Sequence, residues 1–269
     1  MSNIGKAIRM ERLMDRNTGR MVVVPMDHGV TVGPIFGLVD LSQAVNTIAE
    51  GGANAVIGHI GLPRWGHRQA GKDIGLILHL SASTMVSPRP NKKVLVNTVE
   101  NALRMGADGV SVHVNLGDDD EPAMLESLGR VAVECNYWGM PLLAMMYPRG
   151  RNIENETDPE MVRLAARVGA ELGADFVKVS YTGDPESFAR VVEGCPAPIL
   201  IAGGSKLSAE EMFVTIESAM QAGAKGLSVG RNVFQSKDPV AFLQYACSIV
   251  HDGMSAKEAA ELYRQKAGA

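Results

Sequence analysis

The sequence has few cysteines and no excess of positive charge. Cys135, Cys195 and Cys247 stand far apart without CxxC spacing, so we expect neither a disulfide framework nor a zinc ribbon. This pattern favours a reducing, cytoplasmic location. Lys and Arg number 26 against 30 Asp and Glu, which gives a formal net charge of −4. Because a nucleic-acid surface needs a basic patch to neutralise phosphates, we expect small or anionic metabolites as partners and no nucleic acid.

Long apolar runs are also missing. No stretch approaches the roughly 18 consecutive apolar residues of a membrane span, so none is predicted. The N-terminal stretch MSNIGKAIRMERLMDRN carries charges of both signs and lacks the apolar centre of a secretory signal. No GxGxxG motif follows the first predicted strand, which argues against a doubly wound dinucleotide-binding sheet. We predict neither a metal nor an organic cofactor.

What the sequence does contain is a regular alternation of short apolar strands and amphipathic helices. Eight strands are predicted at residues 21–25, 55–59, 76–80, 109–114, 142–147, 176–180, 199–203 and 226–230. Helices are predicted at residues 41–50, 95–105, 122–138, 159–172, 185–193, 209–222 and 239–251, with a weak helical stretch at 63–70. A Gly-Ala turn, typical of a short helix-to-strand connection, recurs in the stretches that begin at Gly51, Met105, Leu172 and Ala222.

This alternation predicts an α/β fold with a single domain. Eight strand and helix units without a linker favour one (β/α)₈ TIM barrel over residues 1–269. The amphipathic segment from Ile4 to Arg16 lies outside these units and predicts an extra N-terminal helix. Its apolar side chains, Ile4, Ile8, Leu13 and Met14, are available for burial in a homo-oligomer, which we expect, or against the bottom of the barrel.

The most informative strand contains a single lysine, Lys178. A period of two places Phe176, Lys178 and Ser180 on one face of this strand and two valines on the other. A parallel strand covered by helices would bury the lysine. Desolvation lowers the pKa of an ammonium group, and a neutral amine can attack a carbonyl to form an imine. The alternative is a lysine in a structural ion pair or on a strand edge.

In a barrel the carboxyl ends of the strands form the active-site face, and here they are rich in polar residues. Imine chemistry needs a base and a proton donor beside the amine. Asp27 and Tyr147, at the ends of the first and fifth strands, fit these roles beside Lys178. The alternative for Asp27 is a turn or cap residue, and for Tyr147 a core aromatic. His28, Arg149 and Ser180 are expected to contact substrate.

The last two strands end in glycine turns that are typical of a phosphate site. Gly203 and Gly204 follow the seventh strand, and Gly230 and Arg231 follow the eighth. Barrels often bind phosphate in these two loops through backbone amides. Arg231 would add a charged hydrogen bond. The alternative is two ordinary turns, which any barrel needs.

The histidines at the strand ends suggest a competing metal hypothesis. His28, His59, His79 and His113, with Asp27, could in principle hold zinc. No HxH spacing supports such a site, and a metal would leave the buried lysine without a role. We therefore prefer the imine chemistry.

Five ordered motifs resemble those of the archaeal-type class I aldolase family. They are PMDHGVTVGP from Pro25, AMMYPRG from Ala144, VKVSYTGD from Val177, IAGGSK from Ile201 and SVGRNVFQ from Ser228. The resemblance implies a (β/α)₈ barrel, with Lys178 as the Schiff-base lysine, Tyr147 as the proton donor and Asp27 as the acid/base carboxylate. It also implies an aldol-type transferase that moves a three-carbon ketone fragment of 6-deoxy-5-ketofructose 1-phosphate to L-aspartate semialdehyde, toward aromatic amino acids.

Two positions bear on specificity within this family. The resemblance leads us to expect tryptophan two residues before the tyrosine in fructose-bisphosphate aldolases, whereas this chain has Met145. It also leads us to expect a lysine at the second strand end, where this chain has Ile60. A class I fructose-1,6-bisphosphate aldolase remains the alternative enzyme. A non-catalytic phosphosugar-binding barrel is a third hypothesis, but it has no use for the lysine, tyrosine and carboxylate together.

Overall fold

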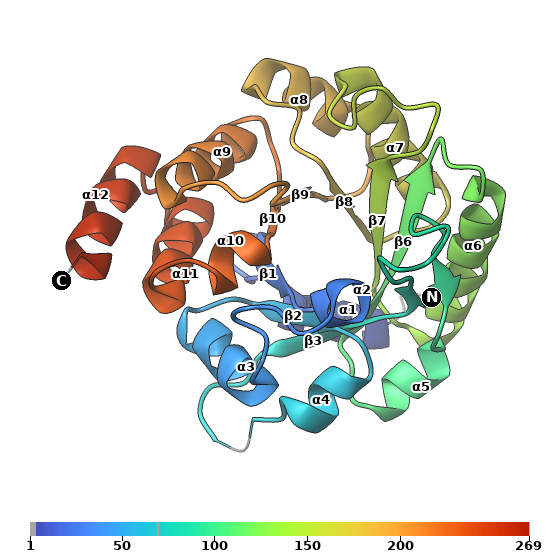
Figure 1. The fold of residues 1–269 in the computed structure, drawn as a ribbon, viewed down its shortest axis with the longest axis horizontal. Helices are drawn as coiled ribbons and strands as arrows, with labels where there is room; N and C mark the ends of the chain where they lie inside the picture. Colours follow the sequence, from blue (N-terminus) through green and yellow to red (C-terminus); the bar gives the residue numbers. More distant parts are fainter. Residues whose placement is uncertain (1–3, 69, 269) are drawn as a thin grey trace.

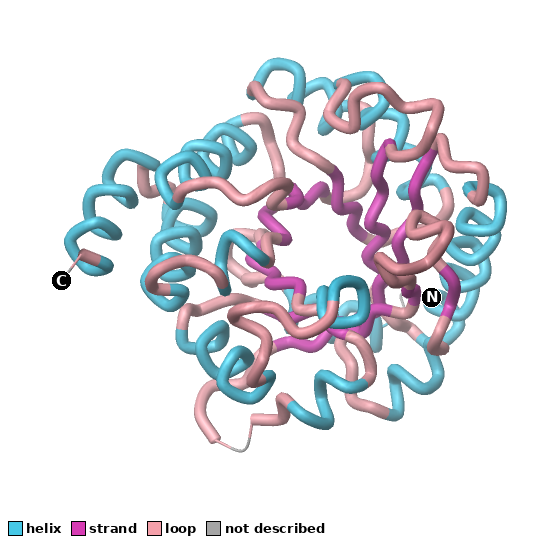
Figure 2. Tube along the Cα trace, in the orientation of Figure 1, coloured by secondary structure: helices cyan, strands magenta, loops and turns pink. Residues whose placement is uncertain are grey.

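The computed structural model describes residues 4–68 and 70–268. Eight parallel strands close into a barrel in the order β1-β10-β9-β8-β7-β6-β3-β2, and helices surround the ring (Figures 1 and 2). The barrel strands are β1 Met21–Pro25, β2 Ala55–Gly58, β3 Gly75–His79, β6 Gly109–Leu116, β7 Leu142–Pro148, β8 Phe176–Val179, β9 Ile199–Ala202 and β10 Gly226–Ser228. The predicted (β/α)₈ barrel is confirmed.

The outer helices follow the strands in chain order. They are α3 Leu41–Glu50, α4 Gly61–Trp65, α5 Val99–Arg104, α6 Glu121–Trp138, α7 Pro159–Glu171, α8 Pro185–Glu193, α9 Ala209–Gln221 and α11 Pro239–Cys247. Local sequence explains their starts: Asp158 caps α7 by accepting hydrogen bonds from two backbone amides, and Ser208 and Glu211 form a capping box on α9. None of the described helices is long and apolar enough to cross a membrane.

Two helix predictions need correction. The helix predicted from residue 95 begins at Val99, because the Thr98 side chain accepts a hydrogen bond from the Asn101 amide as its cap. Residues 94–95 instead form strand β5, which pairs antiparallel with β4, Ser81–Ala82. The weak helix predicted at 63–70 is α4, which ends at Trp65, and its predicted range includes residue 69, which lies outside the described residues.

Some helices were not predicted: α2 His28–Val32, α10 Arg231–Phe234 and the last helix, α12 Ala256–Ala267. The helix predicted at 239–251 is α11, which continues into a π-helical turn, Ser248–Asp252. The apolar face of α12 consists of Ala256, Ala259, Ala260 and Tyr263. Because three of these four side chains are small alanines, this helix left only a weak periodic signal in the sequence.

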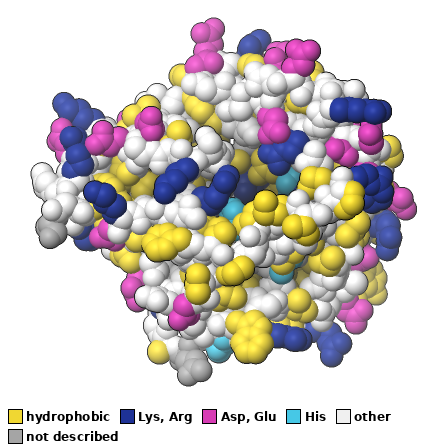
Figure 3. Space-filling view, in the orientation of Figure 1, with side chains coloured by type: hydrophobic (Ala, Val, Ile, Leu, Met, Phe, Trp, Pro, Cys, Tyr) yellow, Lys and Arg dark blue, Asp and Glu magenta, His cyan; other side chains and the backbone are white. Residues whose placement is uncertain are grey.

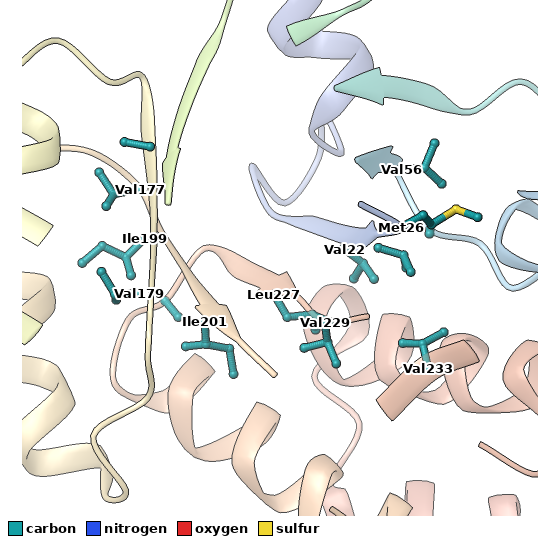
Figure 4. Packing of buried hydrophobic residues seen from close by; sticks show 14 of the residues in the cluster. Val22, Met26, Val56, Val177, Val179, Ile199, Ile201, Leu227, Val229 and Val233 are labelled. Atoms are coloured by element: carbon teal, nitrogen blue, oxygen red, sulfur yellow. The ribbon is translucent and has the colours of Figure 1, made fainter. Parts of the chain in front are cut away.

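The two faces of each strand enter different cores. Along β8, Val177 and Val179 point outward and pack with Ile199 and Ile201 of β9 against the helices (Figure 4). Phe176 faces the barrel interior, as its predicted period of two requires. Complete burial of each such side chain stabilises the fold by roughly 1.5–3 kcal/mol. The register of β8 is therefore strongly determined, because a slip by one residue would turn Lys178 out toward the helices.

The N-terminal helix α1, Ile4–Leu13, closes the bottom of the barrel. Leu13 is completely buried in the interior cluster and lies against Gly75 and Gly109, where β3 and β6 begin. Ile4 and Ile8 remain exposed, at 69% and 53% of their surface. Only part of the helix therefore caps the barrel, and these two isoleucines are still available for a partner surface.

Candidate active site

A cavity of about 680 Å³ opens where the barrel strands end. In Figure 3, histidines lie in the central hollow, with lysines and arginines around it. Every residue predicted for the site lines this cavity: Asp27, His28, Tyr147, Arg149, Lys178, Ser180, Gly203, Gly204, Gly230 and Arg231. The barrel thus brings together residues that are up to 204 positions apart, from Asp27 to Arg231.

Lys178 lies in the middle of β8, opposite Met145 of β7 and Leu200 of β9. Its side chain is 6% exposed and points into the barrel, on the same face as Phe176. Among the described residues, no carboxylate forms an ion pair with it. The structural ion pair that was the alternative for this lysine is therefore not observed.

Asp27 is the residue directly before α2, but its side chain makes no capping hydrogen bond to that helix. Its carboxylate oxygens instead lie 3.6 Å from Nδ1 of His28 and 3.8 Å from Nε2 of His79. Burial raises the pKa of this carboxyl. At the acidic pH where it titrates, however, the protonated forms of His79 and His28, together with Lys178, outweigh burial and hold the pKa at about 2. Asp27 is therefore ionised at neutral pH.

The histidines around Asp27 are neutral at pH 7. Burial lowers the pKa of His79 to about 4, and it also lowers the pKa values of His28, His59 and His113. His79 Nδ1 lies 2.8 Å from the Ser111 hydroxyl, whereas His113 Nε2 lies 2.8 Å from the Asn115 side-chain oxygen and donates to it.

The ring of Tyr147 is positioned by two neighbouring side chains. It packs against His113, with ring centroids 4.9 Å apart, and the Arg149 guanidinium lies 5.3 Å from its centroid. Arg149 also makes two hydrogen bonds, of 2.8 and 2.7 Å, to the Glu156 carboxylate. These contacts orient the phenol at the mouth of the cavity, so Tyr147 is not a fully buried core aromatic.

The glycine turns after β9 and β10 are tied together by Asn232, which is buried. Its side-chain amide donates to the carbonyls of Gly203 and Ser205 and accepts from the Leu207 amide. In the described chain, the amides of Gly204 and Ser205 donate to no protein acceptor. Gly204 has a φ of +59°, which favours glycine. Free amides in such a turn form a suitable anion site.

Other residues that line the cavity were missed in the sequence. Lys206 directly follows the predicted Gly203-Gly204 turn, so its position was a usable signal. Lys93 and Glu156 come from long connections, where no strand end marks them. Ser228 faces inward on β10, and its buried hydroxyl has no hydrogen-bond partner among the described residues. Such an unpaired hydroxyl is costly unless a ligand or water satisfies it.

The structure also bears on the metal hypothesis and on the position of Ile60. Across residues 4–68 and 70–268, no group of three or more His, Cys, Asp or Glu side chains is arranged to hold a metal ion. Ile60 precedes α4 as its cap and lies outside the cavity lining, whereas its neighbour His59 lines the cavity.

The chain matches a family model and several characterised proteins. The model described as DeoC/LacD family aldolase matches residues 21–236. The chain is 44% identical over 258 residues to "2-amino-3,7-dideoxy-D-threo-hept-6-ulosonate synthase 1" of Archaeoglobus fulgidus, covering 96% of this chain and 95% of that protein. It is 39% identical to "2-amino-4,5-dihydroxy-6-oxo-7-(phosphonooxy)heptanoate synthase" of Streptomyces griseus, over 92% of this chain and 90% of that one.

The fold is similar to that of a solved Schiff-base-forming fructose-1,6-bisphosphate aldolase. That structure matches with a TM-score of 0.85 and 31% identity, over 91% of this chain and 100% of the other. Fold, inward lysine and these matches together define a lysine-dependent, class I aldolase-type enzyme. The chain belongs to the DeoC/LacD family of aldolases.

Proposed function

We propose that this protein is a 2-amino-3,7-dideoxy-D-threo-hept-6-ulosonate synthase. It joins a three-carbon ketone fragment of 6-deoxy-5-ketofructose 1-phosphate to L-aspartate semialdehyde, in the biosynthesis of aromatic amino acids through 3-dehydroquinate. The observation that carries the proposal is the buried Lys178, without an ion-pair partner among the described residues, in a cavity that also holds an ionised Asp27 and the Tyr147 phenol. The 44% identity to a synthase of this name supports the choice of substrates.

The proposed reaction begins when the Lys178 amine attacks the C5 ketone of the donor and water leaves, which forms an imine. Asp27 accepts the proton of the C3 hydroxyl, and the bond between C3 and C4 breaks. Carbons C1 to C3 leave as an aldehyde that carries the phosphate, and carbons C4 to C6 remain on the lysine as an enamine. Its carbon C4 attacks the aldehyde of the acceptor, and Tyr147 donates a proton to the new alkoxide. The proton that Asp27 accepted restores the Tyr147 phenol, and hydrolysis of the imine by water releases the product and the free lysine.

The phosphate of the donor is proposed to bind at the turns after β9 and β10. The free amides of Gly204 and Ser205, with the Arg231 guanidinium 3.0 Å from the Gly204 carbonyl, support an anion there. His28, Arg149 and Ser180 stay proposed substrate contacts, because they line the same cavity.

A second candidate follows from the Streptomyces relative, whose name states a product with a phosphonooxy group at C7. Such a product keeps the phosphate on the ketone fragment. The unpaired Ser228 hydroxyl, in the same cavity as the glycine turns, supports this candidate, because it could donate to a phosphate oxygen near the lysine. Fructose-bisphosphate aldolase has less support, because it must hold two phosphates and Glu156 already pairs with Arg149.

One experiment separates these three functions. The purified enzyme is assayed for transfer to L-aspartate semialdehyde with 6-deoxy-5-ketofructose 1-phosphate, for addition of dihydroxyacetone phosphate to the same acceptor, and for cleavage of fructose 1,6-bisphosphate. Values of kcat/KM are compared, since specificity is a difference in transition-state binding. A seven-carbon product without phosphate is expected. If cleavage of the bisphosphate exceeds transfer by more than about tenfold, or roughly 1.4 kcal/mol in barrier, the synthase assignment fails.

The proposal also covers the oligomeric state of the protein and its location in the cell. We expect a homo-oligomer, because Ile4 and Ile8 on α1 are exposed together with Tyr137 and Trp138 on α6. These two helices lie close together, since the Arg9 side chain donates to the Gly139 carbonyl at the end of α6. The free cysteines support a reducing, cytoplasmic location.

A further inference from the structure

Positive charge lines the cavity at two separate places. Lys206 and Arg231 belong to the glycine turns after β9 and β10. Lys93 and Arg149 approach from the connection between β4 and β5 and from the end of β7. The first pair is accounted for by a phosphate. No particular group of either substrate has been assigned to the second pair.

Lys93 and Arg149 differ in their protein partners. Arg149 forms a bidentate ion pair with Glu156, so its guanidinium already has a carboxylate partner. The Lys93 ammonium donates to the Ser83 hydroxyl and, at 3.4 Å, to the Pro90 carbonyl. Both acceptors are uncharged, and within the described ranges no carboxylate forms an ion pair with Lys93. This rim of the cavity therefore offers about one unit of uncompensated positive charge.

The Lys93 ammonium also lies within electrostatic reach of the reaction centre. Burial is the main cause of the lowered pKa values of His59 and His113, and the charge of Lys93 lowers both further. Burial and the charge of Arg149 lower the pKa of Lys93 itself, against the opposing effect of Asp27. A bound anion would relieve this cost, because an opposite charge favours the protonated amine.

We propose that Lys93 is the residue that binds the carboxylate of the acceptor aldehyde and so selects an amino-acid aldehyde. The single uncompensated charge matches a carboxylate rather than a phosphate dianion. This inference rests on the proposed function, since it assigns the acceptor side of that reaction.

The test compares two aldehydes of nearly equal shape. Succinic semialdehyde carries a carboxylate where butanal carries a methyl group, and both react with the same enamine that the donor leaves on the lysine. The ratio of their kcat/KM values therefore reports on acceptor binding alone, whatever a variant does to the donor. A charged hydrogen bond of about 1.5–3 kcal/mol predicts that Lys93→Met lowers kcat/KM for succinic semialdehyde by about 12- to 140-fold. The value for butanal should change by less than about threefold.

Lys92 provides the matched control. It is the adjacent lysine, lies outside the cavity lining and pairs with Asp120 at 3.2 Å. Lys92→Met should keep the wild-type ratio, and Lys93→Arg should retain most of it because it keeps the charge. Activity of Lys93→Met on butanal shows that the variant is folded.

The outcomes separate the two proposals. A wild-type enzyme that does not transfer to L-aspartate semialdehyde overturns the proposed function and the acceptor assignment with it. If the wild type does transfer, but Lys93→Met lowers both aldehydes equally or neither, the acceptor assignment alone is overturned.

Discussion

Replacement of Tyr147 by phenylalanine tests the proposed proton donor with the smallest change in structure. The ring is positioned by His113, with centroids 4.9 Å apart, and by the Arg149 guanidinium at 5.3 Å. Phenylalanine keeps both contacts. No hydrogen bond of the Tyr147 hydroxyl to another described residue is present, so we expect the free energy of unfolding to change by less than about 0.5 kcal/mol.

The effect on catalysis should be much larger. Loss of one positioned proton donor typically costs about 10²-fold or more, which corresponds to a barrier about 2.7 kcal/mol higher. Imine formation needs the lysine, so Tyr147→Phe should still be labelled at Lys178 when borohydride is added with the donor ketose. The assays are steady-state transfer for turnover and peptide mass mapping for the imine.

Tyr181 offers a matched control. Its hydroxyl hydrogen-bonds the Ser218 hydroxyl, and the residue does not line the cavity. Tyr181→Phe should therefore cost about 1 kcal/mol of stability and leave turnover unchanged. Wild-type turnover in Tyr147→Phe would refute the proposed role, and a complete loss of the imine in a folded variant would move Tyr147 to the imine-forming step.

Three further predictions concern the lysine, the buried histidine and assembly. Lys178→Met should abolish turnover and borohydride labelling, whereas an unlabelled wild-type Lys178 peptide, with activity lost in EDTA, would favour a metal. Because the pKa of His79 is about 4 when folded and about 6.5 when unfolded, its neutral form stabilises the fold fully above pH 6.5, and this contribution is lost as the pH falls toward 4. Urea unfolding at pH 7 and pH 5 should differ by about 2 kcal/mol from this residue, and His79→Gln should remove that difference. Light scattering should give a mass above the 28.7 kDa of one chain, and a monomer would contradict the expected assembly.

The predicted strands and the observed strands differ mainly at their ends. The period of two along 176–180 placed Lys178 on the interior face, and the structure has it there, because side-chain alternation follows from strand geometry alone. The helix predicted from residue 95 was wrong at its start, because a threonine cap and a short hairpin decide that boundary.

Only a local pattern can be read directly from the sequence. It determined the eight strand and helix units, the inward face of the strand that carries Lys178 and the glycine turns after the last two strands. These features depend on residues within one or two turns of each other, so neighbouring positions are enough to predict them.

The tertiary structure decided which side chains face each other across the mouth. Asp27 has a pKa of about 2 because closure of the barrel brings Lys178 and His79, which is protonated at that acidic pH, close to its carboxylate. These residues lie 151 and 52 positions further along the chain. Lys93 enters the cavity from a long connection, and Glu156 forms an ion pair with Arg149. Such pairs depend on ring closure and on the paths of the loops, which no local period encodes, because each loop is fixed by packing against residues far away in the chain.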